Sequence, residues 1–341
     1  MKPIKRIEAL LEGKALDTPA INLWKHFPPY DEDPVQLTKK IVQFPERFNW
    51  DFVKVTYQGL FSIQDWGSKI EWPERDCEWP NTCTNVGKVV QPSITNVEDW
   101  GKLNVVPMDK GSWADTIAAA KYVTDHFKGK APVVITVFNP ITTAAKMSGD
   151  KMLEHIRKDP ETFKKGLDVI SDVTQNFIEE LIKIGVDGIF LASQLCSYDK
   201  MSDEEYEIYG RPYDLRILER ANEKMWFNIM HIHATQPMFG TLAKYPVQAL
   251  NWHDRLVKEY DLKKGREICG DKILIGGVDE FGTLLNGTEE EIKAELTDAL
   301  NQVEDGRIIL APGCCVPLNV HEDRLELAKK ILGEIKAVGT F

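Results

Sequence analysis

The residues of this chain that are best suited to metal chemistry are two histidines and a pair of cysteines. His231 and His233 are two positions apart near the end of the apolar segment 226–233, so in a β-strand both imidazoles point to the same side. Cys314 and Cys315 end another apolar segment. Two imidazoles and one thiolate are typical ligands of a catalytic zinc ion that keeps one position open. We therefore predict a metal site formed by His231, His233 and Cys314.

The choice between the two cysteines depends on strand geometry. Successive residues of a regular strand face opposite sides, so Cys315 is expected to point away from Cys314. Gly313 precedes them and favours a close approach of the backbone, which makes Cys314 the expected ligand. The alternative is that the histidines are hydrogen-bonded core residues and the cysteines small buried hydrophobes. The residue types alone leave both interpretations open.

Other polar side chains occur where the predicted strands end. In an α/β barrel these carboxyl ends form one face, which carries the active site. The candidates for catalytic roles are Asp279, His253 and Tyr57. Asp279 is expected either to orient a histidine or to contact the substrate. The candidates for substrate contacts are Trp24, His26, Asn139, Gln194 and Asn251.

The elements that must position these residues follow from hydrophobic patterning. Near-continuous apolar runs are typical of strands buried on both faces of a parallel sheet. Amphipathic helical segments at 111–127, 159–185 and 287–303 alternate with such runs, which predicts a (β/α)8 TIM barrel. An open doubly wound sheet is the alternative, but no Gly-rich phosphate turn follows the first strand. The predicted strands are 19–26, 52–59, 132–139, 188–194, 226–233, 248–254, 273–279 and 307–315.

Two helix starts and one insertion complete this prediction. Ser112 with Asp115 has the pattern of an N-terminal cap, and Thr288 followed by glutamates suits the start of a later helix. The segment 60–110 is rich in Trp and Pro. We interpret it as a long insertion after the second strand, with a hairpin, folded over the barrel mouth. Residues 1–341 are interpreted as a single domain.

Composition limits the classes of partner. The chain has 341 residues, 43% hydrophobic, with a net charge of −11. This charge argues against nucleic acid and against anionic membrane surfaces, since both require clustered Lys and Arg. No apolar run is long enough to cross a bilayer, and no signal peptide is visible. The 6 cysteines are too sparse for a disulfide scaffold, so we expect a cytoplasmic protein.

Several segments resemble the uroporphyrinogen decarboxylase superfamily, and within it the methylcobamide methyltransferases. They are residues 185–218, 228–234, 246–255, 274–292 and 307–325. The resemblance implies a (β/α)8 barrel that binds Zn2+ and uses methylcobamide, a corrinoid, carried by a separate protein. It also implies that a small thiol or another small molecule accepts the methyl group. A homodimer is one expected assembly.

The resemblance assigns the metal ligands position by position. A His-x-Cys pair on the fifth strand and a Gly-Cys motif on the eighth fall on His231, His233 and Cys314. His233 replaces a cysteine of those enzymes. The site then has one negative charge fewer, which makes a bound thiolate less electron-rich and the metal more Lewis acidic. This difference leaves the identity of the acceptor open.

Two alternative functions follow from the same residues. The decarboxylase branch uses an arginine-rich segment after the first strand, but residues 17–40 contain no arginine. A cofactor-free decarboxylase of a tetrapyrrole or polyacid would need cations at the mouth, for which Lys25 and Arg211 are candidates. The other alternative is a corrinoid- or tetrapyrrole-binding protein without turnover. The fold alone does not separate these functions.

Overall fold

The centre of the molecule is an eight-stranded parallel sheet. The computed structural model describes residues 1–72 and 86–335, and the strands follow the order β1-β10-β9-β8-β7-β6-β5-β2. Every predicted strand is present, although each is shorter than the apolar run that predicted it. The bounds are β1 (Ala20–Ile21), β2 (Val53–Val55), β5 (Val133–Phe138), β6 (Gly188–Ser193), β7 (Ile229–Ile232), β8 (Ala249–Trp252), β9 (Ile273–Val278) and β10 (Ile308–Pro312).

The sheet curls, and β1 and β2 lie at its two ends. Hydrogen bonds link these ends: the backbone N–H of Ile21 donates to the Asp51 carboxylate (2.7 Å), and the Asp51 N–H donates to the Ile21 carbonyl (3.3 Å). The Asn22 side chain accepts a bond from the Phe52 N–H (3.1 Å). In the described part of the chain no β-ladder pairs β1 with β2. The sheet is therefore a strongly curled parallel sheet whose ends are joined through side chains and one backbone bond.

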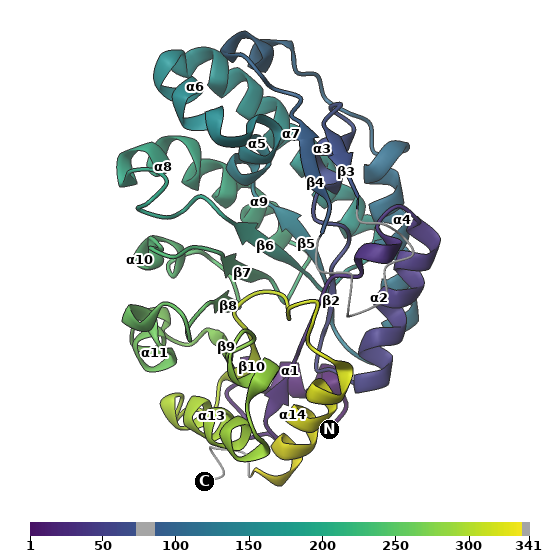
Figure 1. Ribbon diagram of the computed structural model, residues 1–341, viewed down its shortest axis with the longest axis vertical. Coiled ribbons are helices and arrows are strands. Elements are labelled where there is room, and N and C mark those ends of the chain that lie inside the picture. The colour runs from purple at the N-terminus through teal and green to yellow at the C-terminus, as the bar shows by residue number, and fades with distance from the viewer. Residues whose placement is uncertain (73–85, 336–341) are drawn as a thin grey trace.

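Helices connect the strands and line the outside of the sheet (Figure 1). The predicted helices 111–127, 159–185 and 287–303 correspond to α4, α7 and α13. The described helices are α1 (Pro3–Leu11), α2 (Pro34–Phe48), α3 (Phe61–Gln64), α4 (Gly111–Phe127), α5 (Pro140–Ser148), α6 (Met152–Lys158), α7 (Pro160–Ile184), α8 (Asp203–Tyr209), α9 (Arg211–Asn222), α10 (Phe239–Leu242), α11 (Leu262–Cys269), α12 (Thr283–Asn286), α13 (Glu289–Gln302) and α14 (Glu322–Glu334). Short 3-10 turns are η1 (Pro28–Tyr30), η2 (Val97–Lys102), η3 (Gly149–Lys151) and η4 (Lys258–Tyr260).

The two predicted helix starts have different outcomes. Thr288 caps α13 through a capping box with Glu291, as predicted. The prediction for Ser112 was wrong: α4 begins after Lys110 without a local side-chain cap. The carboxylate of Asp65 accepts bonds from the first N–H groups of α4 instead, including that of Ser112 (3.1 Å). A cap supplied from a distant segment leaves no local sequence pattern.

Alternation along the strands produces two apolar cores. One set of strand residues, including Ile229, Ala249 and Ile275, packs inside the curl of the sheet. Residues of the opposite parity, such as Met230 and Leu274, pack against the helices. Both faces are buried, which explains the near-continuous apolar runs in the sequence. Helix α1 packs against the inner core. Positions in register with the inner core therefore point into the interior of the sheet.

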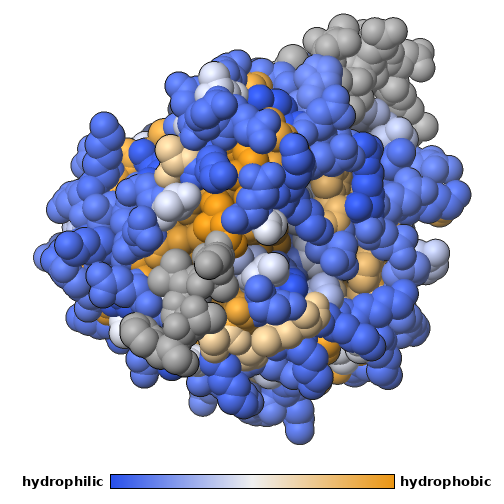
Figure 2. Space-filling view, turned by 90° about the horizontal axis from the view of Figure 1, so that it is seen from below, coloured by the Kyte–Doolittle hydropathy of each residue, from blue (hydrophilic) through white to orange (hydrophobic). Residues whose placement is uncertain are grey.

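The segment 60–110 contains a small second sheet. β3 (Lys69–Glu71) and β4 (Lys88–Gln91) pair antiparallel. The part of the predicted insertion at 73–85 lies outside the described residues. None of the helices in the described ranges is long and apolar enough to cross a membrane. Figure 2 shows polar residues over most of the surface, with apolar residues gathered toward the middle of the face in view.

Candidate metal centre

The three predicted metal ligands lie together. One ligand atom from each of His231, His233 and Cys314 falls within a group whose members are all within 4.8 Å of one another. His231 is on β7 and has the parity of Ile229, so its ring points into the interior. His233 follows the end of the same strand, and its ring centroid is 5.9 Å from that of His231. The two histidines that are paired in the sequence therefore share one side.

The loop after β10 brings the cysteines into the site. β10 ends at Pro312, so the strict alternation of strand side chains does not extend to the cysteines. Cys314 and Cys315 both line the same cavity, and the prediction that Cys315 points away was wrong for this reason. A Cβ on Gly313 would lie 2.4 Å from Nδ1 and 2.6 Å from Cα of His253. Glycine is therefore required for the backbone to approach His253 closely.

Asn251 determines which nitrogen of His231 is available. The Asn251 amide nitrogen donates to the carbonyls of Ile275 (2.9 Å) and Pro312 (3.0 Å), which identifies its Oδ1 as the acceptor of the bond to His231 Nδ1 (2.6 Å). His231 Nδ1 then carries the proton, and Nε2 has a free lone pair. A buried polar group that fixes the tautomer in this way is a common partner of a metal-binding histidine.

His253 and Glu280 lie directly behind the cluster. His253 Nε2 is 3.4 Å from His233 Nδ1, and His253 Nδ1 is 3.3 Å from a carboxylate oxygen of Glu280 without forming a hydrogen bond. The Glu280 carboxylate also accepts bonds from the N–H groups of Gly313 (3.2 Å) and Cys314 (3.0 Å). Glu280 therefore fixes the loop that carries Cys314, a role that sequence reasoning missed.

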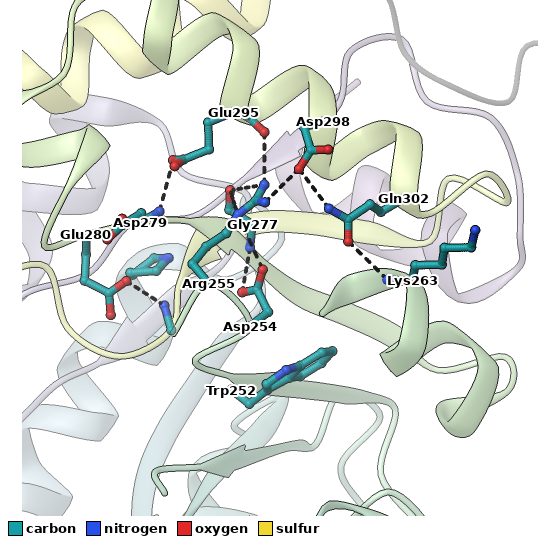
Figure 3. A network of polar contacts seen from close by, with 12 residues as sticks. Trp252, Asp254, Arg255, Lys263, Gly277, Asp279, Glu280, Glu295, Asp298 and Gln302 are labelled. Carbon is teal, nitrogen blue, oxygen red and sulfur yellow. Dashed lines mark hydrogen bonds and ion pairs between the residues drawn. The ribbon is translucent and has the colours of Figure 1, made fainter. Parts of the chain in front are cut away.

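The carboxylate of Asp279 has a different use from that of its neighbour Glu280. It accepts bonds from the N–H groups of Phe281 (3.1 Å) and Gly282 (2.9 Å) and so closes the turn after β9. Asp279 is not among the residues that line the cavity. In Figure 3 Glu280 extends away from the side chains around Arg255. The sequence pattern identified the correct turn, but the carboxylate that reaches the cluster belongs to the next residue.

An arginine anchors this turn to the scaffold. Arg255 donates to the carbonyls of Gly277 (3.1 Å) and Glu295 (3.0 Å) and pairs with Asp298 (2.7 Å) (Figure 3). The Asp254 carboxylate accepts the Gly277 N–H (2.9 Å). These bonds tie the end of β8 to β9 and α13. The neighbouring turn that carries Glu280 therefore begins from a fixed position.

The electrostatic surroundings favour a thiolate at Cys314. The pKa of its thiol is held well below the usual range, because the neighbouring Cys315 thiol and the surrounding imidazoles favour the thiolate and outweigh the effect of burial. Burial lowers the pKa of His231. Burial would also lower the pKa of His253, but Cys314 and Glu280 reverse this and raise it to about 9. The cluster thus combines a thiolate with a neutral imidazole at His231, the forms that bind metals.

A cavity of about 220 Å³ opens beside the cluster. Its lining includes His231 and Cys314 together with four residues that the sequence predicted: Trp24, His26, Tyr57 and Gln194. Burial, with a contribution from Lys54, lowers the pKa of His26 to about 4. Burial raises the pKa of Tyr57 well above its usual value. Both side chains are therefore neutral at pH 7.

Asn139 is a predicted substrate contact that the structure places elsewhere. It is fully buried, its Oδ1 accepts the Thr142 N–H at the start of α5 (3.1 Å), and its Nδ2 donates to Asp214 (2.9 Å). Asp214 also accepts bonds from two tyrosine hydroxyls. All these groups are satisfied by one another. Asn139 therefore caps a helix and supports a buried network, and it is not among the cavity-lining residues.

Two lysines in the cavity were missed. Lys54 on β2 and Lys146 on α5 line the same cavity as His231. Lys54 has the parity of Phe52, an inner-core residue, so strand alternation alone points it inward. The single lysine in the apolar run at 52–55 was the available signal. Lys146 lies on a helix and had no such signal.

Comparisons with known proteins identify the family of the chain. A model of the family "Uroporphyrinogen decarboxylase (URO-D)" matches residues 20–332. The methylcobamide:CoM methyltransferase MtbA of Methanosarcina acetivorans is 25% identical over 227 residues, which cover 66% of this chain and 65% of that protein. The methylcobamide:CoM methyltransferase MtaA of Methanosarcina barkeri (strain Fusaro) is 25% identical over 232 residues, covering 66% of each chain. The chain thus spans about two thirds of the length of these relatives.

Solved structures share the fold. A methyltransferase from Methanosarcina mazei superposes with a TM-score of 0.80 at 20% identity, covering 98% of this chain and 99% of that one. A B12-independent methionine synthase from Shewanella sp. W3-18-1 gives a TM-score of 0.56 at 16% identity, covering 94% and 96%. The family match covers all eight strands of the parallel sheet, and all three candidate ligands lie within it. The chain belongs to the uroporphyrinogen decarboxylase family.

Proposed function

We propose that the protein is a zinc-dependent methyltransferase that moves a methyl group between a methylcobamide and a small acceptor. The observation that carries this proposal is the group of His231, His233 and Cys314 ligand atoms within 4.8 Å of one another, with His231 and Cys314 facing a cavity. The similarity to methylcobamide:CoM methyltransferases supports the same reaction class.

The donor set fits zinc. His231, through Nε2, His233 and Cys314 would hold the ion, with one position left for the acceptor. Bound zinc supplies Lewis acidity that lowers the pKa of the acceptor, so that an anionic nucleophile exists at neutral pH. The chain's own contribution is to fix the ligands: Asn251 sets the tautomer of His231, and Glu280 holds the backbone of Cys314. The acceptor's bond to the methyl group forms as the methyl–cobalt bond breaks, and the electron pair stays on cobalt.

The volume of the cavity suits the small acceptor and not the corrinoid. About 220 Å³ corresponds to roughly seven water molecules at ~30 Å³ each. A small acceptor fits this space, whereas a corrinoid macrocycle does not. We infer that the corrinoid approaches the mouth from outside, carried by a separate protein. We also infer that the linked ends of the curled sheet close a (β/α)8 barrel in a single domain.

The decarboxylase alternative is not supported by the two cations that were predicted for it. The two cations considered for a polyacid substrate lie elsewhere: Lys25 contacts the Val320 carbonyl (3.3 Å), and Arg211 pairs with Glu207 (3.3 Å) on the surface. Neither lines the cavity with His231. A cofactor-free decarboxylase would also leave the cluster of imidazoles and thiolate without a use.

The test is the metal content and methyl transfer of the purified protein. We expect about one zinc per chain, measured by elemental analysis after zinc loading and dialysis. Demethylation of free methylcobalamin, followed by its visible spectrum, should require both zinc and a small thiol acceptor. His231→Ala and Cys314→Ala should lose the zinc and the reaction together.

A matched control separates ligand loss from general damage. Cys269 is buried in α11, so Cys269→Ala removes a buried thiol elsewhere and should retain zinc. Wild-type protein that does not hold zinc under these conditions would overturn the proposal. Zinc binding without any methyl transfer from the corrinoid would support the non-catalytic binding protein, and turnover of uroporphyrinogen would support the decarboxylase.

A further inference from the structure

Cys315 is a thiol in the cavity for which the proposed reaction has no use. It is absent from the group of ligand atoms formed by His231, His233 and Cys314, yet it lines the same cavity as Cys314. Successive side chains of a regular strand point to opposite sides, so two adjacent thiols of a strand do not share a cavity. β10 ends at Pro312, before both cysteines. The loop conformation therefore places two adjacent thiols on the same side.

The two cysteines of this loop differ from the other described cysteines in their access to solvent. Cys314 and Cys315 are half-buried and line a cavity of about 220 Å³, which admits an oxidant as small as hydrogen peroxide. Cys196 and Cys269 are only 1% and 3% exposed. Exposure is one of the conditions that select which thiols of a protein are oxidised. A small oxidant should therefore react in the loop and leave the two buried thiols intact.

The backbone is held on both sides of the cysteine pair. The Glu280 carboxylate accepts a bond from the Cys314 N–H (3.0 Å), and the Val316 N–H donates to the Trp24 carbonyl (2.8 Å). Cys314 and Cys315 are free thiols in the structure. Because the loop is fixed and the residues are adjacent, each thiol has the other as a reaction partner at high effective concentration.

We infer that Cys314 and Cys315 form a reversible oxidative modification site, in which Cys315 is the resolving cysteine for the candidate metal ligand Cys314. Hydrogen peroxide converts the Cys314 thiol to a sulfenic acid, as the O–O bond breaks and a molecule of water leaves. The Cys315 thiol attacks that sulfur, the S–O bond breaks, and a second molecule of water leaves as the disulfide forms. Peroxide is reduced, and the two thiols are oxidised to one disulfide.

Adjacency makes this disulfide easy to reverse. The Cα atoms of adjacent residues are about 3.8 Å apart across a trans peptide, whereas disulfides usually join Cα atoms about 4.4–6.8 Å apart. Strained and accessible disulfides are reduced more readily than structural ones. A dithiol reductant should therefore restore both thiols. Without a resolving thiol, a sulfenic acid is oxidised further to a sulfinic acid, which dithiols do not reduce.

The consequence for the candidate metal site is a loss of zinc that can be reversed. Metal binding requires a thiolate, so Cys314 in a disulfide no longer serves as a ligand. The same sulfur is protected from oxidation while it binds zinc. The modification itself depends only on the two cysteines, whereas its effect on zinc rests on the proposed function.

Peptide mass mapping of zinc-free protein tests the modification directly. Trypsin cleavage after Arg307 and Arg324 gives the peptide 308–324, whose only cysteines are Cys314 and Cys315. The protein is treated with a small molar excess of hydrogen peroxide, quenched, denatured and alkylated. We expect this peptide to be unalkylated and about 2 Da lighter than the reduced form. Dithiothreitol before alkylation should restore both thiols.

The other described cysteines serve as internal controls. The peptides with Cys196 and Cys269 should be alkylated to the same extent with and without peroxide. Full alkylation of Cys314 and Cys315 after the treatment would overturn the inference. A sulfinic acid on Cys314 beside a free Cys315 thiol would overturn it as well, since the resolving reaction would then be absent.

The resolving role is assigned by a substitution that keeps the candidate ligand. In Cys315→Ser, peroxide should convert Cys314 to its sulfinic acid, which adds about 32 Da to the peptide and is not reversed by dithiothreitol. Cys269→Ser is the matched control and should recover its Cys314 thiol as wild type does. Thermal unfolding before oxidation checks that each variant is folded. Equal recovery of the Cys314 thiol in Cys315→Ser and in wild type would refute the role of Cys315.

Zinc release connects the modification to the proposed function. Zinc-loaded wild type is treated with peroxide beside a chromogenic chelator, and we expect it to release about one zinc per chain and to bind zinc again after reduction. Zinc should slow formation of the disulfide at least about tenfold relative to zinc-free protein. Disulfide formation in a protein that does not bind zinc would sustain the modification site and reject the proposed function. Zinc binding by a protein whose zinc-free thiols resist peroxide would do the reverse.

Discussion

The two walls of the cavity are built by different means. The wall with His231 and Cys314 is held by directional hydrogen bonds: Asn251 fixes the histidine ring, and Glu280 fixes the cysteine loop. On the other wall, Lys54 and Lys146 extend over aromatic rings, and among the described residues neither forms an ion pair with a carboxylate. A metal site requires fixed ligand geometry, which hydrogen bonds of this kind supply. The difference shows that the wall with His231 and Cys314 is organised in advance by hydrogen bonds.

The strongest test of the organised wall compares its two adjacent cysteines. Cys314→Ala should lower zinc affinity more than about 100-fold. Loss of a direct metal ligand weakens binding more than loss of a residue that only orients a ligand, which typically lowers affinity about 10- to 100-fold. Cys315→Ala should retain about one zinc per chain, since only Cys314 belongs to the ligand group. Competition with a chromogenic chelator measures both affinities. Equal losses in the two variants would mean that the vicinal pair acts as a unit.

Asn251 and Asn139 provide the next comparison, because both are fully buried asparagines. Asn251→Ala should lower zinc affinity roughly 10- to 100-fold, because His231 loses the bond that sets its tautomer. Asn139→Ala should leave zinc affinity unchanged and lower the unfolding free energy by about 1–3 kcal/mol, through loss of a helix cap and of a bond to Asp214. Chelator competition and urea unfolding are measured on both proteins. A weaker zinc site in the Asn139 variant would contradict this division of roles.

The cationic wall is expected to reduce the stability of the empty protein. Burial lowers the pKa of Lys146 in the folded state to about 7, below its value of about 10.4 in the unfolded chain. A base with a depressed folded pKa loses folding stability as the pH falls from the unfolded value toward the folded one. Lys146→Met should remove this loss, so its gain in unfolding free energy over wild type should be larger at pH 7 than at pH 9.5, by on the order of 2 kcal/mol.

Urea unfolding of zinc-free wild type and Lys146→Met at both pH values measures that difference. Lys39→Met, on the exposed face of α2, serves as the control and should show no pH-dependent gain. A gain of the same size at both pH values would indicate better packing alone. It would contradict the claim that the charge of Lys146 lowers the stability of the empty protein.

The smallest expected effect concerns two adjacent carboxylates. Glu280→Ala should lower zinc affinity about tenfold, because the N–H groups of Gly313 and Cys314 lose their acceptor. Asp279→Ala should leave zinc affinity unchanged and cost about 1 kcal/mol of stability, through the turn that it closes. Zinc titration and thermal unfolding distinguish the two outcomes. Zinc loss in the Asp279 variant alone would mean that Asp279, and not Glu280, supports the zinc site.

The fold was predictable because its signals are local. Strands covered on both faces leave continuous apolar runs, and all eight runs correspond to strands of the parallel sheet. The pairing of His231 with His233 was predictable from strand periodicity as well. Lys54 could have been found in the same way, as a lone cation at an inward position of a strand.

Other features depended on where the strands end and on contacts between distant segments. Cys315 joins the cavity because β10 stops at Pro312, after which alternation no longer applies. Asp65 caps α4 from outside the helix, so the local pattern at Ser112 was misleading. Glu280 reaches Cys314 across 34 positions of sequence, while Asp279 turns back on its own loop.

The sequence by itself determined the residue types that can bind a metal and the elements that carry them. Side-chain chemistry is a property of each residue, and hydrophobic periodicity is a property of adjacent residues, so both can be seen without the tertiary structure. Only the tertiary structure decided which of those residues meet. His231, Cys314 and Lys146 come from β7, the loop after β10 and α5, and no local pattern relates their positions. The curl of the sheet brings them to one cavity, and this convergence turns separate polar residues into a candidate metal site that faces a wall with two lysines.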